Sequence, residues 1–183
     1  MIACLGWGSL IWSPRTLPLA GNWLGDGPEL PIEFSRVSAD GRLTLAITEG
    51  AKPLTVLWAE LNVSSIDSGV EALAEREGIS DRNFKFSIGL WSNSRCSRHK
   101  EANQVGDWAS QRGIEAVIWT ALKPGLDKDS RGVVPSLSDA LGYLHGTSSA
   151  VRACAEEYIR RAPAQIATEY RAAIEKEFGW APL

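Results

Sequence analysis

The order of the periodic segments constrains this fold more than any other feature of the chain. Up to about residue 122 the sequence consists of short apolar runs rich in β-branched and aromatic residues, and after Ser136 it follows a helical period almost to the end. Strands gathered early and helices gathered late are typical of α+β folds, whereas parallel α/β folds alternate the two. We therefore predict an α+β protein: a small mixed or antiparallel sheet, barrel-like in shape, with flanking helices and a helical C-terminal part.

The individual patterns predict where these elements begin and end. Alternating or continuous apolar runs predict strands over 2–6, 31–37, 42–47, 54–63, 84–91 and 114–122, and we expect the early ones and the last to share one sheet. The strand over 42–47 alternates apolar and polar residues, which indicates one buried face. Ser64 or Ser65 is expected to cap a helix that ends at Gly78. Three further helices are predicted over 136–144, 148–161 and 164–178.

Composition excludes several classes of protein. The chain has 183 residues, 44% of them hydrophobic, and a net charge of -3, which fits a single domain over 1–183 and excludes disorder and binding to nucleic acid through a basic surface. No apolar run is long enough to span a bilayer, and the first residues do not resemble a signal peptide. With only three Cys, we expect a cytoplasmic protein without disulfides. Eight Trp indicate a deep core or an aromatic-walled cavity.

The segment Gly6-Trp7-Gly8-Ser9-Leu10, directly after the first predicted strand, is the most informative motif. Two glycines around one aromatic residue allow positive φ angles and can turn successive N–H groups toward a carboxylate or oxyanion. A dinucleotide-binding loop is disfavoured because the third glycine of its motif is missing, and no Gly-Lys-Ser/Thr phosphate loop occurs. A glycine turn that only redirects the strand remains an alternative.

Glu77 is the candidate general base. It lies four residues after Leu73, on the same helix face as Val70, whereas Glu71 and Glu75 lie off that apolar face and should be solvated. A carboxylate on an apolar face at a helix C-terminus binds a proton more readily, because burial and the helix dipole both disfavour its charge. The alternative is a frayed last turn in which the carboxylate pairs with a nearby Arg.

Four segments together resemble the γ-glutamylcyclotransferase superfamily. Gly-Trp-Gly-Ser-Leu-Ile-Trp at 6–12 resembles its Tyr-Gly-Ser-Leu/Asn loop and is most similar to the ChaC-type branch. Gly-Arg-Leu-Thr-Leu at 41–45 is similar to the Gly-Arg-Val-x-Thr-Leu segment of that branch. Val-Leu-Trp-Ala-Glu-Leu at 56–61 resembles its Val-Trp-Gly-Val-x-Tyr strand, and 73–78 resembles the helix end that carries the catalytic glutamate, which falls on Glu77. The likeness covers roughly residues 2–78.

This resemblance implies a small barrel with flanking helices and an enzyme that cyclises a γ-glutamyl amide or peptide to 5-oxoproline, releasing the amine. The α-amine of the substrate is the nucleophile, so no metal or cofactor is needed. Glu77 would take the amine proton, and it should face the same pocket as the backbone amides of the loop. The substrate-binding residues implied are Gly6, Trp7, Gly8, Ser9, Leu10 and Trp12.

The sequence departs from the family pattern in two places, and both bear on the substrate. Trp7 replaces the usual Tyr, and no Tyr follows Gly78 in the next strand. A non-catalytic protein that binds a small carboxylate or γ-glutamyl ligand on the same scaffold is therefore the alternative function. An interaction module that uses the amphipathic helix over 164–178 is a third possibility. The expected partner is a small-molecule γ-glutamyl substrate, without nucleic acid or membrane.

The remaining polar clusters predict no second site. The basic segment 95–100 is best interpreted as a solvated loop, although it could contact an anionic substrate. As a zinc half-site it offers only Cys96 and His99, with no partner at ligand spacing. Cys4, in an apolar strand, and Cys154, in a helix, are expected to be small core residues.

Overall fold

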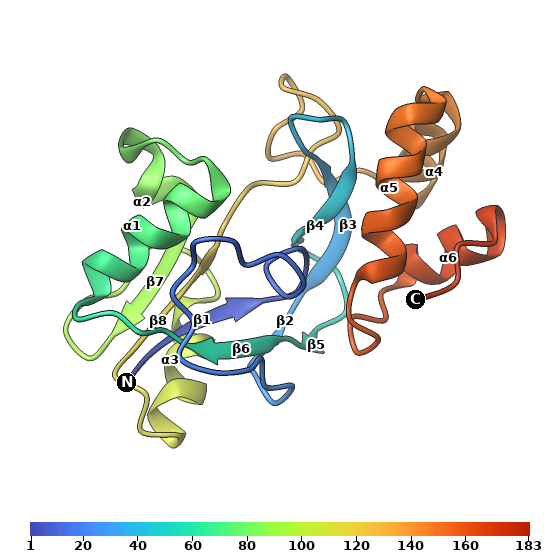
Figure 1. Ribbon diagram of the computed structural model, residues 1–183. Coiled ribbons are helices and arrows are strands. Elements are labelled where there is room, and N and C mark those ends of the chain that lie inside the picture. The colour runs from blue at the N-terminus through green and yellow to red at the C-terminus, as the bar shows by residue number, and fades with distance from the viewer. The chain divides into compact units, whose positions relative to one another are not determined.

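The structure of the protein is a computed structural model that describes residues 1–183, with its elements labelled in Figure 1. The chain divides into two compact units, each built from three separate segments. Unit 1 consists of Met1–Gly6, Ser13–Glu29 and Thr55–Leu122, and unit 2 of Trp7–Trp12, Leu30–Leu54 and Lys123–Leu183. The first strand and the loop that follows it therefore belong to different units.

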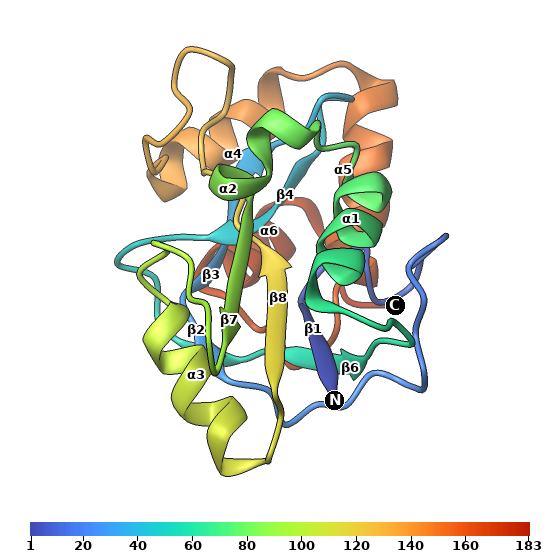
Figure 2. The ribbon, with the colours of Figure 1, turned by 90° about the vertical axis from the view of Figure 1, so that its left-hand side faces the viewer.

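Unit 1 is built on a mixed sheet of four strands. Their order is β6 (Leu57–Glu60), β1 (Ile2–Gly6), β8 (Ala116–Thr120) and β7 (Ile88–Ser92). β1 runs antiparallel to β6 and parallel to β8, and β7 runs antiparallel to β8. Figure 2 shows β7, β8 and β1 side by side. Because β1 and β8 are the central strands, their side chains are almost all buried, as their continuous apolar sequences require.

Helices of unit 1 pack on this sheet. α1 (Ile66–Glu77) lies against β8, and α3 (Ala102–Gln111) lies against β7. A short 3₁₀ helix η1 (Asp81–Asn83) and the single turn α2 (Phe84–Ser87) lead into β7. Ser65 caps α1 by accepting a hydrogen bond from the Ser68 N–H, as the sequence predicts.

Unit 2 combines a hairpin with three helices. β3 (Ile32–Val37) pairs antiparallel with β4 (Leu43–Ile47). α5 (Ser149–Arg161) packs on β4, α6 (Glu169–Phe178) packs on β3, and α4 (Leu137–Gly146) contacts α6. The two-residue strands β2 (Glu29–Leu30) and β5 (Leu54–Thr55) form the third small sheet, where the chain passes between the units.

The turn between β3 and β4 is fixed by contacts with the helices of unit 2. Gly41 has a φ of 84°, which favours glycine, and its carbonyl accepts a hydrogen bond of 2.6 Å from the Tyr143 hydroxyl. A Cβ on Gly41 would lie 3.0 Å from Val151 of α5. The backbone that leads into Arg42 is therefore held in place.

The predicted α+β class and mixed sheet are confirmed, but the prediction of one sheet is wrong. The strands form three sheets, and none of them closes into a barrel. The outer edge of β6 is occupied by bridges from Leu19 to Leu61 and from Leu24 to Trp58, so another strand cannot extend the sheet there.

Several predicted elements also differ in their bounds. The strand over 54–63 is split at Val56, and 84–91 begins as the turn α2. Four consecutive residues of β4 are buried, and α5 packs on it, so its predicted half-buried pattern is wrong. The helix predicted over 164–178 begins at Glu169, and α3 is not predicted at all. None of the helices has the length and apolar character needed to cross a membrane.

Candidate functional site

The loop that follows β1 forms a tight turn, in which the Ile11 N–H donates to the Gly8 carbonyl at 2.9 Å. Neither Gly6 nor Gly8 has a positive φ, so the expected left-handed conformation at these glycines is wrong. The N–H groups of Gly8 and Leu10 nevertheless form no hydrogen bond within the protein, although both residues are buried. Buried amides are rarely left unpaired, so these two donors are available to a ligand.

Gly8 is required for a different reason, which is the close approach of Tyr158 from α5. A Cβ at Gly8 would lie 2.2 Å from the Tyr158 hydroxyl oxygen, closer than side-chain atoms can pack. Tyr158 is itself only 6% exposed. The loop therefore lies directly against the hydroxyl end of this tyrosine. Sequence reasoning missed Tyr158 because nothing in the local pattern of α5 distinguishes it from an ordinary core residue.

Aromatic side chains surround Tyr158. The Trp12 ring lies edge-on to it, with centroids 5.3 Å apart, and the Phe34 ring also lies edge-on at 6.4 Å. Edge-to-face pairs of this kind stabilise the packing beyond simple burial. Trp7 is buried, whereas Trp12 is partly exposed. The loop is thus held in one conformation by an aromatic cluster of unit 2.

Two guanidinium groups lie over this cluster. The Cζ of Arg42 lies 5.5 Å from the centroid of the Tyr158 ring, and the Cζ of Arg161 lies 5.7 Å from the centroid of the Trp12 ring. Their side chains are 33% and 41% exposed, respectively. Both distances are within the range of cation–π contacts. The part of the loop in unit 2 is therefore flanked by positive charge, which sequence spacing alone did not indicate.

Glu77 ends α1 in a well-formed cap, not in a frayed turn. Gly78 takes the left-handed conformation with a φ of 65°, and the Ile79 N–H donates to the Ala74 carbonyl at 2.9 Å. The Glu77 side chain is 16% exposed, whereas Glu71 and Glu75 are exposed, as predicted. The end of the helix thus places one carboxylate at the margin of the core of unit 1.

Arg76 forms an ion pair with Glu77. Its Nη1 lies 2.6 Å from Oε1 of Glu77, and its Nη2 donates to the Ser13 carbonyl at 2.8 Å. The Arg76 side chain is only 7% exposed, so the pair is largely shielded from solvent. The pairing with a nearby Arg was one of the two predicted environments of Glu77. The contact with Ser13 fixes the guanidinium and, through it, the carboxylate.

The charge of Glu77 affects the buried thiol of Cys4 in β1. Burial raises the pKa of the Cys4 thiol far above its ordinary value, and the negative charge of Glu77 raises it further, partly opposed by Arg76. The charges of Glu77 and Arg76 therefore both act on a thiol of β1. Cys4 is buried, which confirms the prediction of a core residue.

The predicted site residues fall in both units. Gly6 and Glu77 belong to unit 1, and the remaining predicted residues belong to unit 2, namely Trp7, Gly8, Ser9, Leu10 and Trp12. The structure brings Gly8 and Trp12 of the second group together with Tyr158, and it brings Glu77 together with Arg76 and Ser13. A common pocket for the carboxylate and the loop amides stays a prediction.

The basic segment 95–100 and the remaining cysteines provide no metal site. Arg95 pairs with Asp67, both of them exposed, and Cys96 is exposed. No group of three or more His, Cys, Asp or Glu residues is arranged to hold a metal ion. Cys154 is also exposed, so the prediction of a core residue is wrong. It lies on α5 beside Ala155, and only one face of that helix packs inward.

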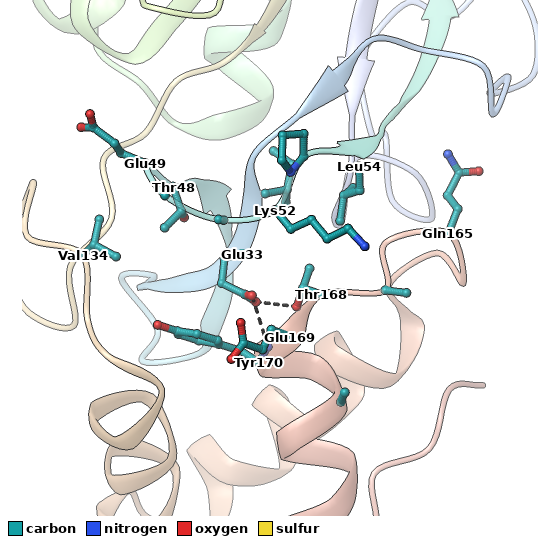
Figure 3. Close-up of a pocket in the computed structure, with 16 residues that line it drawn as sticks. Glu33, Thr48, Glu49, Lys52, Leu54, Val134, Gln165, Thr168, Glu169 and Tyr170 are labelled. Atoms are coloured by element: carbon teal, nitrogen blue, oxygen red, sulfur yellow. Dashed lines mark hydrogen bonds between the residues drawn. The ribbon is translucent and has the colours of Figure 1, made fainter.

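A cavity of about 710 Å³, which was not predicted, lies in unit 2 (Figure 3). The buried Glu33 carboxylate lines it and accepts hydrogen bonds from the Thr168 hydroxyl and from the N–H of Tyr170, the latter at 3.2 Å. Burial raises the pKa of Glu33 above its ordinary value, although these hydrogen bonds oppose the shift. These hydrogen bonds attach β3 to the first turn of α6, so Glu33 has a structural role.

Searches of protein-family models, curated proteins and solved structures found no match to this chain.

Proposed function

We propose that the protein is a γ-glutamylcyclotransferase-like enzyme that converts a γ-glutamyl amide or peptide into 5-oxoproline and a free amine. The observation that carries the proposal is the fixed carboxylate of Glu77. It is largely buried, it ends a capped helix, and it is oriented by Arg76, whose guanidinium is bonded to the Ser13 carbonyl. A carboxylate held in this way is suited to proton transfer, because it is already in place before each turnover and does not need to be reoriented.

The proposed reaction is an intramolecular acyl transfer. The α-amine of the substrate attacks its own γ-carbonyl carbon, so a new C–N bond closes the five-membered ring. Glu77 accepts a proton from the attacking amine and returns it to the leaving nitrogen as the original amide C–N bond breaks. No group is oxidised or reduced, and the carboxylate ends the cycle as it began. General-base catalysis of this kind contributes about 10²–10⁴-fold.

The loop after β1 is proposed to bind the glutamyl group. Support comes from the amides of Gly8 and Leu10, which have no partner within the protein. Such donors can stabilise the oxyanion that develops on the γ-carbonyl. The aromatic packing of Trp12 on Tyr158 keeps the loop from rearranging between turnovers. The proposal requires one substrate to reach both this loop and Glu77.

The test is a screen of γ-glutamyl amides, peptides and amino acids for release of 5-oxoproline, repeated with Glu77→Gln. This variant keeps the shape of the side chain and removes its basicity, so turnover should fall by about 10²-fold or more while ligand affinity changes little. Glu75→Gln is the matched control, because Glu75 lies two residues before Glu77 on the same helix and is exposed. This variant should retain turnover.

Two outcomes would contradict the proposal. Equal loss of turnover in the Glu75 and Glu77 variants would point to damage of the helix. Wild-type protein that binds γ-glutamyl compounds without releasing 5-oxoproline would support the non-catalytic binding protein instead. The observation that favours this second function is the buried Trp7, which stands where the family has Tyr and lacks the tyrosine hydroxyl.

The same proposal includes three further expectations. The barrel-like shape that the family resemblance implies for the sheet stays part of the proposal. We expect a cytoplasmic location. The expected partner is the γ-glutamyl substrate alone, without nucleic acid or membrane.

A further inference from the structure

Tyr158 connects the loop after β1 to Arg42. Its hydroxyl lies against Gly8, and the face of its ring lies under the Arg42 guanidinium, 5.5 Å from Cζ to the ring centroid. All three residues belong to unit 2, so this arrangement is internal to one compact unit. Arg42 and the loop therefore contact the same tyrosine, Arg42 at the face of its ring and Gly8 at its hydroxyl end.

Arg42 is oriented so that part of its guanidinium is open to a ligand. Its Nε pairs with Oδ2 of Asp40 at 2.7 Å, and its two terminal nitrogens form no hydrogen bond within the protein. Burial alone would raise the pKa of Asp40, but hydrogen bonds from Ser38 and Arg42 outweigh it and hold that pKa below its ordinary value. Asp40 therefore remains ionised near neutral pH and keeps the guanidinium turned the same way.

We propose that Arg42 binds the α-carboxylate of the glutamyl group, using the outer edge of its guanidinium as a bidentate donor. This inference rests on the proposed function, because it assigns the recognition of that substrate. The two terminal N–H donors form a planar fork that matches the two oxygens of a carboxylate. Tyr158 supports the fork from below, and the turn at Gly41 fixes the backbone that carries it.

Binding at this position has a consequence for specificity. In a γ-glutamyl group the α-carboxylate and the α-amine share one carbon atom, so holding the carboxylate also places the nucleophilic amine. Substrates without an α-carboxylate should therefore bind weakly. Arg161, the other cation near the loop, is less suited to this role because one of its terminal nitrogens, Nη1, already pairs with Glu157 at 3.0 Å, whereas Arg42 pairs only through Nε.

The test uses two ligands that cannot cyclise and that differ only in a carboxylate, glutaric acid monoanilide and butyric anilide. Isothermal titration calorimetry of the wild-type protein should find the carboxylate ligand bound about 10- to 100-fold more tightly, the effect expected of a charged hydrogen bond. Arg42→Gln should lose this preference while its affinity for butyric anilide stays unchanged. Lys52→Gln is the control, because it removes another cation of unit 2, which is exposed, and it should keep the preference.

Several results would overturn the assignment. A wild-type protein with no preference for the carboxylate ligand would do so, as would Arg42→Gln protein with the wild-type preference. Arg42→Lys keeps the charge without the fork, so the logarithm of the ratio of the two dissociation constants should fall to half of its wild-type value or less. This variant replaces Arg42→Gln in the test if Arg42→Gln does not fold. Arg42-dependent binding without 5-oxoproline release would refute the proposed activity and retain the carboxylate site. Release of 5-oxoproline with unchanged binding in Arg42→Gln would refute the carboxylate site alone.

Discussion

Glu33 of β3 accepts a hydrogen bond from the hydroxyl of Thr168, the residue that caps α6, across 135 positions of sequence. The same carboxylate accepts the N–H of Phe34 at 2.8 Å and the N–H of Tyr170 at 3.2 Å. Glu33 is only 4% exposed, so its charge is stabilised by these donors and by the N-terminal end of α6 in place of water. One buried carboxylate therefore attaches the last helix to the hairpin of unit 2 (Figure 3).

Glu33 should make stability depend on pH in the direction opposite to a carboxylate whose pKa is lowered in the folded protein. Its pKa in the folded protein is raised above the ordinary value of 4.5, mainly by burial, and the nearby negative charge of Glu169 adds to the shift. The folded state therefore binds this proton more tightly than the unfolded state, and the stability gained from the proton is complete below pH 4.5 and lost as pH rises through the folded pKa.

Urea unfolding of the wild type and of Glu33→Gln across this pH range measures the effect, because the variant cannot titrate here. The free energy of unfolding of the wild type, minus that of the variant, should decrease as pH rises above 4.5. Using the difference removes the contribution of carboxyls with lowered pKa values, such as Asp40 and Asp139, which titrate with the opposite sign. A difference that does not change with pH would contradict the interpretation.

Gly8→Ala should destabilise the protein through Tyr158. The new Cβ would lie 2.2 Å from the tyrosine hydroxyl, and overpacking of this kind costs about 1–3 kcal/mol. In a Tyr158→Phe background the nearest atom of the ring is Cζ at 3.2 Å, so the same substitution should cost less. A double-mutant cycle by urea unfolding gives the coupling between the two positions. Additive effects would show that the loop can move away from the ring.

Gly142→Ala is the matched control for Gly8→Ala. Gly142 lies inside α4, and apart from its chain neighbours and the backbone of its own helix no atom lies within 4 Å of a Cβ built on it. Alanine favours the helix over glycine by about 0.5–1 kcal/mol, so this variant should be more stable than the wild type. The opposite signs of two Gly→Ala changes would locate the cost at Gly8 in the contact with Tyr158.

The elements that could be predicted from sequence are those whose signals are local. Ser65 and Gly78 mark both ends of α1, and the Asp-Gly turn marks the hairpin of β3 and β4. α3 lacks such signals, because no side chain caps its N-terminus and Gly106 interrupts its helical pattern. That glycine is explained only by tertiary structure, since a Cβ there would lie 2.2 Å from the indole nitrogen of Trp91. Local propensity was overridden by packing.

The candidate site divides in the same way. Glu77 could be found from its spacing after Leu73, because position on a helix face is a local property. Arg42 and Tyr158 could not, because their relation to Gly8 depends on how a hairpin and a later helix pack together. Gly8 was expected to have a positive φ angle, whereas it is required by the close contact with Tyr158, which also depends on tertiary packing. A sequence pattern reveals that a position requires glycine, but it does not distinguish an unusual φ angle from a close neighbour.

Substitutions of Arg76 and Glu77, which form an ion pair, should have coupled effects on both stability and turnover. Arg76→Met leaves the largely buried Glu77 carboxylate without its cation and the Ser13 carbonyl without this donor, and breaking such a pair costs about 3 kcal/mol. Glu77→Gln should cost less, because the amide oxygen still accepts from the guanidinium. If Arg76 positions Glu77 for catalysis, both single variants and the double variant should share one low rate of 5-oxoproline release, since residues that act as a unit are not additive. Urea unfolding and a turnover assay on the same four proteins measure both cycles. A double variant that is slower than the wild type by the product of the two single effects would mean that Arg76 acts on turnover independently of Glu77.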